Sequence, residues 1–112
     1  MARYQYVVLT NAVAGREDEY NEWYSKTHIR EVCQIPGFKA ATRYKIVPRD
    51  GTKAPLKHKY MALYEIDTQD VNATLAELSR RSGAGELVKC SALDGDATST
   101  TLYEQIAEYK AK

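Results

Sequence analysis

The amino-acid sequence predicts a single α+β domain built in the order strand, helix, strand, strand, helix, strand. Runs of β-branched and aromatic residues alternate with segments of helical apolar spacing, and the 112 residues are too few for a second hydrophobic core. Because strand–helix–strand crossovers are right-handed, this order predicts a four-stranded antiparallel sheet with both helices on one face. We therefore expect residues 1–112 to fold as one domain.

The first part of the chain is expected to form a strand and a helix joined by a turn. The run from Tyr4 to Asn11 is apolar and rich in β-branched residues, which is typical of a strand covered on both faces. Residues 11–15 are expected to form a turn, and a helix then follows over residues 16–27, with acidic residues in its first turn. Helical spacing places one aromatic stripe on this helix, made up of Tyr20, Trp23, Tyr24 and Thr27.

The rest of the chain supplies three strands and a second helix. After the helix-breaking segment at Pro36 and Gly37, residues 38–47 are expected to form a strand in which Arg43 faces away from Phe38. A polar loop over residues 48–59 leads to a third strand at residues 60–66, and a helix follows over residues 71–82, with Gly83 ending it in a left-handed conformation. Residues 102–109 are expected to form the last strand, with a helix as the alternative.

Charge and hydropathy narrow the range of partners. Sixteen basic and fifteen acidic residues give a net charge of +1, so no strong field is present to attract nucleic acid or a membrane surface. No apolar run approaches the roughly 20 residues that span a bilayer, and the N-terminal residues lack the apolar core of a signal peptide. We therefore expect a cytoplasmic protein in which Cys33 and Cys90 are reduced thiols.

The predicted sheet has one face that no helix covers. In the first strand, Tyr6 and Val8 alternate with Val7 and Leu9, so neither face is polar enough to be left in water. Packing this face against a second copy of the chain would bury it, and we expect a homodimer. A monomer with a mildly apolar open sheet remains the alternative.

A small-molecule site is expected beside His28. This residue follows Tyr24 by one helical turn, at the edge of the aromatic stripe, so its ring is aimed at the gap between helix and sheet. His58 lies between two lysines in the polar loop, and without paired carboxylates or a closely spaced histidine pair a metal site is not expected. Asn11 at the end of the first strand is expected near the same cleft. In the alternative interpretation, His28 caps the helix end and the aromatic stripe is only core.

The sequence also resembles a known family between residues 6 and 44. The resemblance rests on Asn11, Gly15, the run from Glu17 to His28 with its Trp-Tyr-x-x-x-His pattern, the Ile-Pro-Gly-Phe segment at residues 35–38, and Arg43-Tyr44. These features are similar to the EthD-like branch of the dimeric α+β barrel superfamily. The resemblance implies a ferredoxin-like dimer whose cleft on the helix side binds aromatic or polyketide-like molecules, commonly without a metal or organic cofactor.

Site residues follow from the same resemblance. It implies that His28 is the catalytic acid or base and that Trp23, Tyr24 and Asn11 shape or orient the ligand. Arg43 matches an arginine of the second strand in that family, and Tyr64 on the third strand completes the expected binding residues, with the directions of these two side chains left open.

Proton transfer on a phenolic or enolisable aromatic substrate is the expected reaction. His28 would move the proton, and tyrosine hydroxyls or Asn11 would stabilise the developing oxyanion. Lyases, isomerases and cyclases all use these groups, and the sequence does not separate them. Two other functions stay open: a non-catalytic binding protein for an aromatic metabolite, and a cofactor-free monooxygenase.

Overall fold

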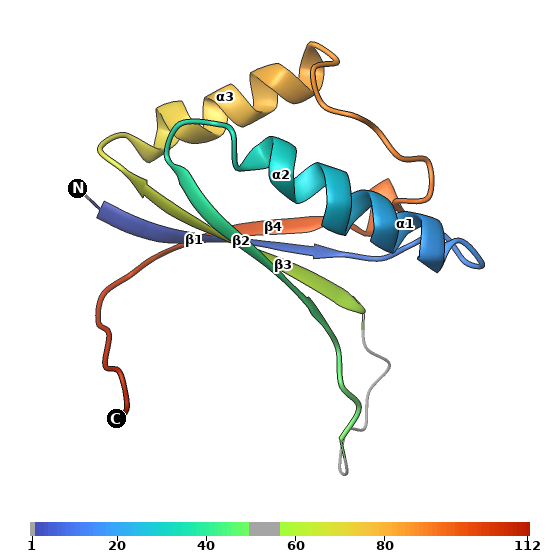
Figure 1. Ribbon diagram of the computed structural model, residues 1–112, viewed down its shortest axis with the longest axis horizontal. Helices are drawn as coiled ribbons and strands as arrows, with labels where there is room; N and C mark the ends of the chain where they lie inside the picture. Colours follow the sequence, from blue (N-terminus) through green and yellow to red (C-terminus); the bar gives the residue numbers. More distant parts are fainter. Residues whose placement is uncertain (1, 50–56) are drawn as a thin grey trace.

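The described residues, 2–49 and 57–112 of the computed structural model, form one four-stranded sheet with the helices on a single side (Figure 1). The strands are β1 (Ala2–Thr10), β2 (Phe38–Lys45), β3 (Tyr60–Thr68) and β4 (Ser99–Glu104). Their order across the sheet is β2-β3-β1-β4, and every neighbouring pair is antiparallel. The predicted α+β fold and the predicted order of elements are therefore confirmed.

The first helical segment is longer than predicted and contains an irregular turn. It consists of α1 (Glu17–Trp23), a π-helical turn η1 (Tyr24–His28) and α2 (Ile29–Val32). The prediction ended this helix near Thr27, but the chain leaves the helix only ahead of Pro36 and Gly37, where Gly37 has a φ of +101°. His28 therefore lies inside a continuous helical segment and not at its end.

A β-bulge reverses the predicted orientation of side chains in β2. The pairing of β2 with β3 shifts register between Phe38 and Ala40, so that Phe38 lies opposite Ile66 and Arg43 lies opposite Ala62. Both β3 residues belong to its buried face. Strict alternation predicted Arg43 on the face opposite to Phe38, and the extra residue of the bulge brings Arg43 to the helix side instead.

The last third of the chain differs from the prediction in its boundaries. Helix α3 (Val71–Gly83) agrees with the predicted span, but Gly85, with a φ of +74°, adopts the left-handed conformation that was expected of Gly83. Strand β4 begins three residues earlier than predicted and stops at Glu104, opposite Tyr4 of β1, and one further backbone hydrogen bond of 2.8 Å joins Gln105 to the carbonyl oxygen of Arg3. Residues 50–56 of the predicted loop lie outside the described residues.

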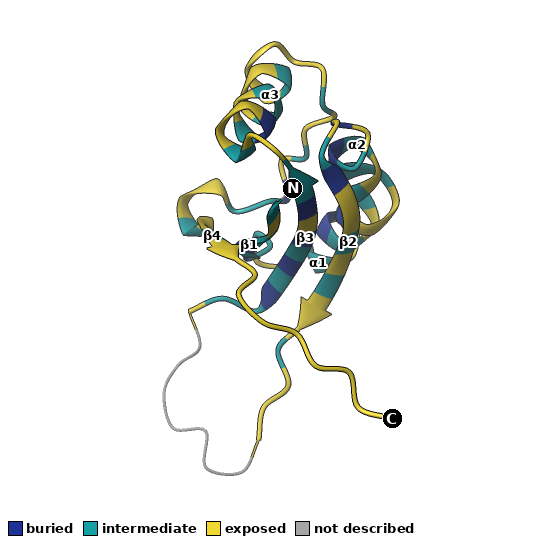
Figure 2. Ribbon diagram, turned by 90° about the vertical axis from the view of Figure 1, so that its left-hand side faces the viewer, coloured by how far each residue is buried: buried dark blue, intermediate teal, exposed yellow. Residues whose placement is uncertain are grey.

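The two faces of the sheet differ in how they are covered (Figure 2). On the helix side, β3 contributes four buried residues in alternation, Tyr60, Ala62, Tyr64 and Ile66. On the opposite side, the apolar residues Val7, Leu9, Met61 and Leu63 are only half-buried. The hydrophobic core therefore lies between the sheet and the helices, and an apolar stripe remains on the open face.

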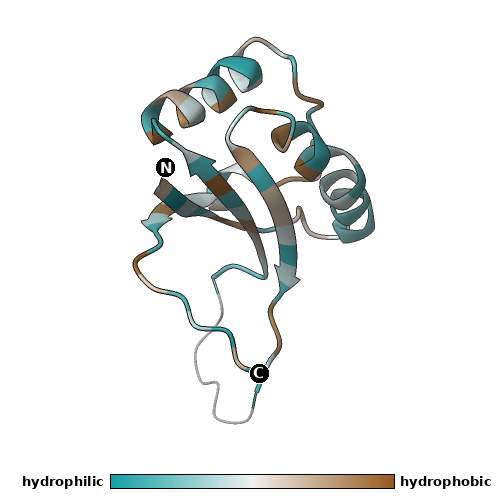
Figure 3. Cartoon of the chain, turned by 60° about the vertical axis from the view of Figure 1, so that its left-hand side comes forward, coloured by the Kyte–Doolittle hydropathy of each residue, from teal (hydrophilic) through white to brown (hydrophobic). Residues whose placement is uncertain are grey.

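Helix polarity accords with this layering. Among the described residues, no helix is long and apolar enough to cross a membrane. Figure 3 shows α1 as a largely hydrophilic ribbon, in which Asp18 and Glu19 are exposed while Tyr20 is fully buried. The helix is thus held to the sheet by an aromatic contact surface.

Candidate functional site

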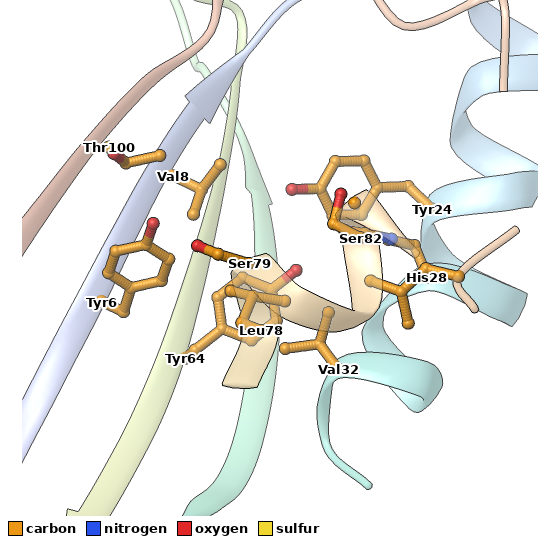
Figure 4. Close-up of a pocket in the computed structure, with 12 residues that line it drawn as sticks. Tyr6, Val8, Tyr24, His28, Val32, Tyr64, Leu78, Ser79, Ser82 and Thr100 are labelled. Carbon is orange, nitrogen blue, oxygen red and sulfur yellow. The ribbon is translucent and has the colours of Figure 1, made fainter. Parts of the chain in front are cut away.

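A cavity of about 470 Å³ lies between the sheet and the helices (Figure 4). Its sheet wall contains Tyr6, Val8 and Tyr64, and its helix wall contains Tyr24 and His28. Figure 4 shows the hydroxyls of Tyr24 and Tyr64 pointing toward the same space from different elements. The volume and the mainly aromatic walls are typical of a site for a small organic molecule.

Aromatic contacts hold His28 in the wall of this cavity. Its ring stacks on Trp23 with a centroid distance of 4.6 Å and meets Tyr24 edge-on at 5.0 Å. Trp23 does not border the cavity, but its indole nitrogen donates a 3.0 Å hydrogen bond to the carbonyl oxygen of Val88. Trp23 therefore fixes the imidazole from behind, and the π-helical turn that ends at His28 sets the direction of the ring.

His28 is neutral at physiological pH. Its Nδ1 atom is buried and has no hydrogen-bond partner among the described residues. Burial, and then the positive charge of Arg43, lower the pKa of His28 to about 4. The alternative that a charged His28 caps a helix end does not hold, because the helix continues to Val32 and the ring avoids its charged form.

The two tyrosines nearest to His28 keep their protons. Burial raises the pKa of Tyr24 to about 12, and burial together with the adjacent Tyr24 raises the pKa of Tyr64. Neither the Tyr64 hydroxyl nor Nδ1 of His28 makes a hydrogen bond of ordinary geometry among the described residues, and the polar neighbour of the Tyr64 hydroxyl is Tyr24. Two residues that line the cavity thus each contain a polar atom that is buried and makes no ordinary hydrogen bond within the described part of the chain.

Besides Trp23, two more of the predicted binding residues do not border this cavity. The side-chain amide of Asn11 donates to the carbonyl oxygen of Lys57 at 2.7 Å and accepts from the backbone nitrogen of Lys59 at 2.8 Å. Arg43 packs its guanidinium 4.5 Å from the ring centroid of Tyr24 and does not border the cavity. The structure therefore brings His28, Tyr24 and Tyr64 together, places Trp23 behind them, and leaves Asn11 to hold the backbone ahead of β3.

Some lining residues were not predicted. Tyr6 faces the cavity from β1, Thr100 from β4, and Ser79 and Ser82 from α3. The signal for the two serines was present in the sequence, since each follows an apolar residue of the α3 stripe, Leu75 or Leu78, by four positions. Among residues 2–49 and 57–112, no group of three or more His, Cys, Asp or Glu side chains could hold a metal ion.

Comparisons with known proteins support the fold. No protein-family model matches the sequence, and no curated protein matches it. A candidate monooxygenase from Shewanella loihica is 14% identical with a TM-score of 0.61, and the match covers 96% of this chain and 99% of that one. An EthD family protein from Bacillus halodurans is 17% identical with a TM-score of 0.61, covering 95% and 100%. A mutant of MhuD, solved with two manganese protoporphyrin IX molecules per active site, is 15% identical with a TM-score of 0.63, covering 96% and 99%.

These likenesses define the structural class of the protein. The chain has the ferredoxin-like α+β fold that the sequence resemblance to EthD-like proteins implied, and it shares this fold with an EthD family protein. At 14–17% identity the likeness concerns the fold alone.

Replacing Tyr64 by Phe should leave the free energy of unfolding unchanged or raise it by up to about 1 kcal/mol, because the lost hydroxyl is buried without a partner. The matched variant Tyr20→Phe removes a hydroxyl that is hydrogen-bonded to Thr10, and it should cost about 1–2 kcal/mol. Urea denaturation measures both. An equal loss in the two variants would show that the Tyr64 hydroxyl is bonded in the native protein.

The low pKa of His28 predicts acid sensitivity. Between pH 6.5, its ordinary pKa, and pH 4, about its pKa in the folded protein, the imidazole of His28 binds a proton in the unfolded chain but not in the folded chain. The free energy of unfolding is therefore unaffected by this group above pH 6.5, and it falls by up to about 3 kcal/mol as the pH drops to 4. Denaturation at several pH values should show this slope in the wild type and in His58→Asn, but not in His28→Asn. An unchanged slope in His28→Asn would contradict the assignment.

Proposed function

We propose that the protein is a small-molecule enzyme that works without a cofactor and transfers a proton on an aromatic, phenolic or polyketide-like substrate. One observation carries the proposal: Nδ1 of His28 and the hydroxyl of Tyr64 are both buried without partners, and both residues border one aromatic-walled cavity. Unused buried polar atoms are costly to a fold, and a ligand with one donor and one acceptor would satisfy both.

The proposed chemistry uses His28 as a transient proton carrier. The neutral ring has one unprotonated nitrogen, which takes a proton from the substrate while the electron pair is drawn to a substrate oxygen. Tyr64 donates a hydrogen bond to that oxygen, and its raised pKa keeps its own proton in place. Burial and Arg43 disfavour the imidazolium, so the proton returns readily to another atom of the substrate. Isomerase, cyclase and lyase outcomes all follow from this step.

The substrate class follows from the walls of the cavity. Val8, Val32 and Leu78 supply apolar surface between the tyrosines, and apart from His28, which is neutral, the described lining residues carry no ionisable acid or base that is charged at pH 7. A charged group would be poorly solvated there. A neutral phenol or polyketide-like molecule suits this surface.

A non-catalytic binding role is the second candidate. A base with a pKa of about 4 is weak at neutral pH, so the same unsatisfied atoms could serve ligand binding alone. A cofactor-free monooxygenase is the third, supported by the fold shared with a candidate monooxygenase. Oxygen consumption during turnover would separate it from the other two.

We also propose that the chain forms a homodimer through the open face of its sheet. Val7, Leu9, Met61 and Leu63 form a half-buried apolar stripe there, flanked by the exposed side chains of Tyr44 and Tyr103. Burying such a stripe against its own copy is the usual way in which a symmetric dimer removes it from water.

The proposed reaction predicts solvent exchange at carbon. In D₂O, the protein should accelerate deuterium incorporation into the methyl group of ortho-hydroxyacetophenone, an enolisable phenol, as followed by NMR. His28→Ala should slow this exchange by about 10²-fold or more, and His58→Ala should not. The wild-type rate should be flat above pH 5 and fall below pH 4, because protonation removes the base.

Thermal shifts in the same samples separate the candidate functions. A shift with phenols that persists in His28→Ala, without exchange in the wild type, would support the binding protein instead. No shift and no exchange with a panel of phenols and polyketide-like aromatics would contradict both functions.

The dimer predicts a specific response to charge on the open face. Analytical ultracentrifugation at about 100 μM should show a dimer for the wild type and a monomer for Leu63→Asp, because an isolated carboxylate cannot be buried. The control Asn72→Asp places the same charge on the exposed side of α3 and should stay dimeric. A monomeric wild type would contradict the proposal.

A further inference from the structure

Arg43 borders a second cavity, of about 330 Å³, which is separate from the cavity beside His28. It is lined by Asn21, Ser25, Arg43, Tyr44, Lys45 and Tyr60. The side chain of Tyr44 points to the open face of the sheet, and each of the other five side chains carries a hydrogen-bonding group, two of them cationic. This composition differs from that of the cavity beside His28, which is aromatic and uncharged at neutral pH.

The guanidinium of Arg43 is held in place by neutral groups alone. It donates hydrogen bonds to Oγ of Ser25 at 2.8 Å and to Oδ1 of Asn21 at 3.1 Å. It also packs against tyrosine faces, with centroid distances of 4.5 Å to Tyr24 and 5.4 Å to Tyr60. These contacts orient the planar donor group and use two of its five N–H bonds, so donors remain for a ligand.

The positive charge of this cavity has no internal counter-ion. Among the described residues, no carboxylate forms an ion pair with Arg43 or Lys45. The carboxylate of Glu17 accepts a hydrogen bond from Tyr60, one of the lining residues, and pairs with Lys59 at 3.0 Å. The charge of Lys45 also contributes to lowering the pKa of Glu17, yet Glu17 itself does not border the cavity.

We propose that this cavity is a binding site for a small oxyanion, a carboxylate group or inorganic phosphate. Arg43 supplies a fixed planar fork for two oxygens, Lys45 adds a second positive charge, and Ser25 adds a hydroxyl. The tyrosine rings beneath Arg43 hold the fork in place, so little side-chain entropy is lost when an anion binds.

An anion bound in this cavity would change the pKa of His28. The charge of Arg43 contributes to the lowered pKa of His28, and Tyr24 contacts both side chains. An anion on Arg43 would offset that charge and make His28 a stronger base. By linkage, protonation of His28 would strengthen anion binding in return.

The test is an NMR titration of the full chain at pH 7 and constant ionic strength with inorganic phosphate and, separately, with acetate. The Arg43 Nε–H signal should shift to saturation, and the pKa of His28, measured on its ring protons, should rise when the site is filled. Lys45→Gln should weaken binding about fivefold and Arg43→Lys about tenfold or more. The control Lys39→Gln removes the same charge from an exposed position at the other end of β2 and should bind like the wild type.

Each outcome of the titration supports or contradicts the proposed oxyanion site. Saturation by phosphate alone assigns an inorganic phosphate site, and saturation by acetate alone assigns a carboxylate site. Saturation by both supports a general oxyanion site. A response that does not saturate below about 100 mM, or equal weakening by Lys39→Gln and Lys45→Gln, would overturn the proposal, since it would indicate only screening of surface charge. None of these results depends on whether phenols bind beside His28.

Discussion

The contact between Arg43 and the ring of Tyr24 is the interaction on which the rest of the site depends. It joins β2 to the first helical segment and, through Tyr60, to β3. On one side it leaves an uncharged aromatic cavity, and on the other it leaves a polar cavity with unpaired positive charge. The same charge adds to the effect of burial in lowering the pKa of His28, the candidate catalytic group.

Two irregularities of the backbone bring these side chains together. The bulge near the start of β2 turns Arg43 toward the helices, and the π-helical turn at residues 24–28 places His28 beside Trp23 and Tyr24. Both features interrupt a regular repeat, and both occur where functional side chains gather. Natural sequences tolerate such departures mainly where a site requires them.

The cavity beside His28 is lined by residues whose buried polar groups lower the stability of the fold. A hydroxyl on Tyr64 and an acceptor on His28 are kept from water without a partner, although Tyr20, one of the most deeply buried tyrosines, bonds its hydroxyl to Thr10. The protein therefore has the means to satisfy buried phenols and does not do so at this place. Unsatisfied groups that border one cavity are what a preformed binding site is expected to contain.

The sequence by itself determined the order of the elements, the two-layer arrangement and the importance of the stripe that contains Trp23 and Tyr24, because these depend on short-range periodicity and on chain handedness. It also indicated His28 and Tyr64. The direction of Arg43, the engagement of Asn11 with the backbone of Lys57 and Lys59, and the serines of α3 in the cavity wall were decided by the tertiary structure. A bulge or a π-turn adds one residue to a repeat and turns every later side chain, and which register results depends on partners that lie far away along the chain.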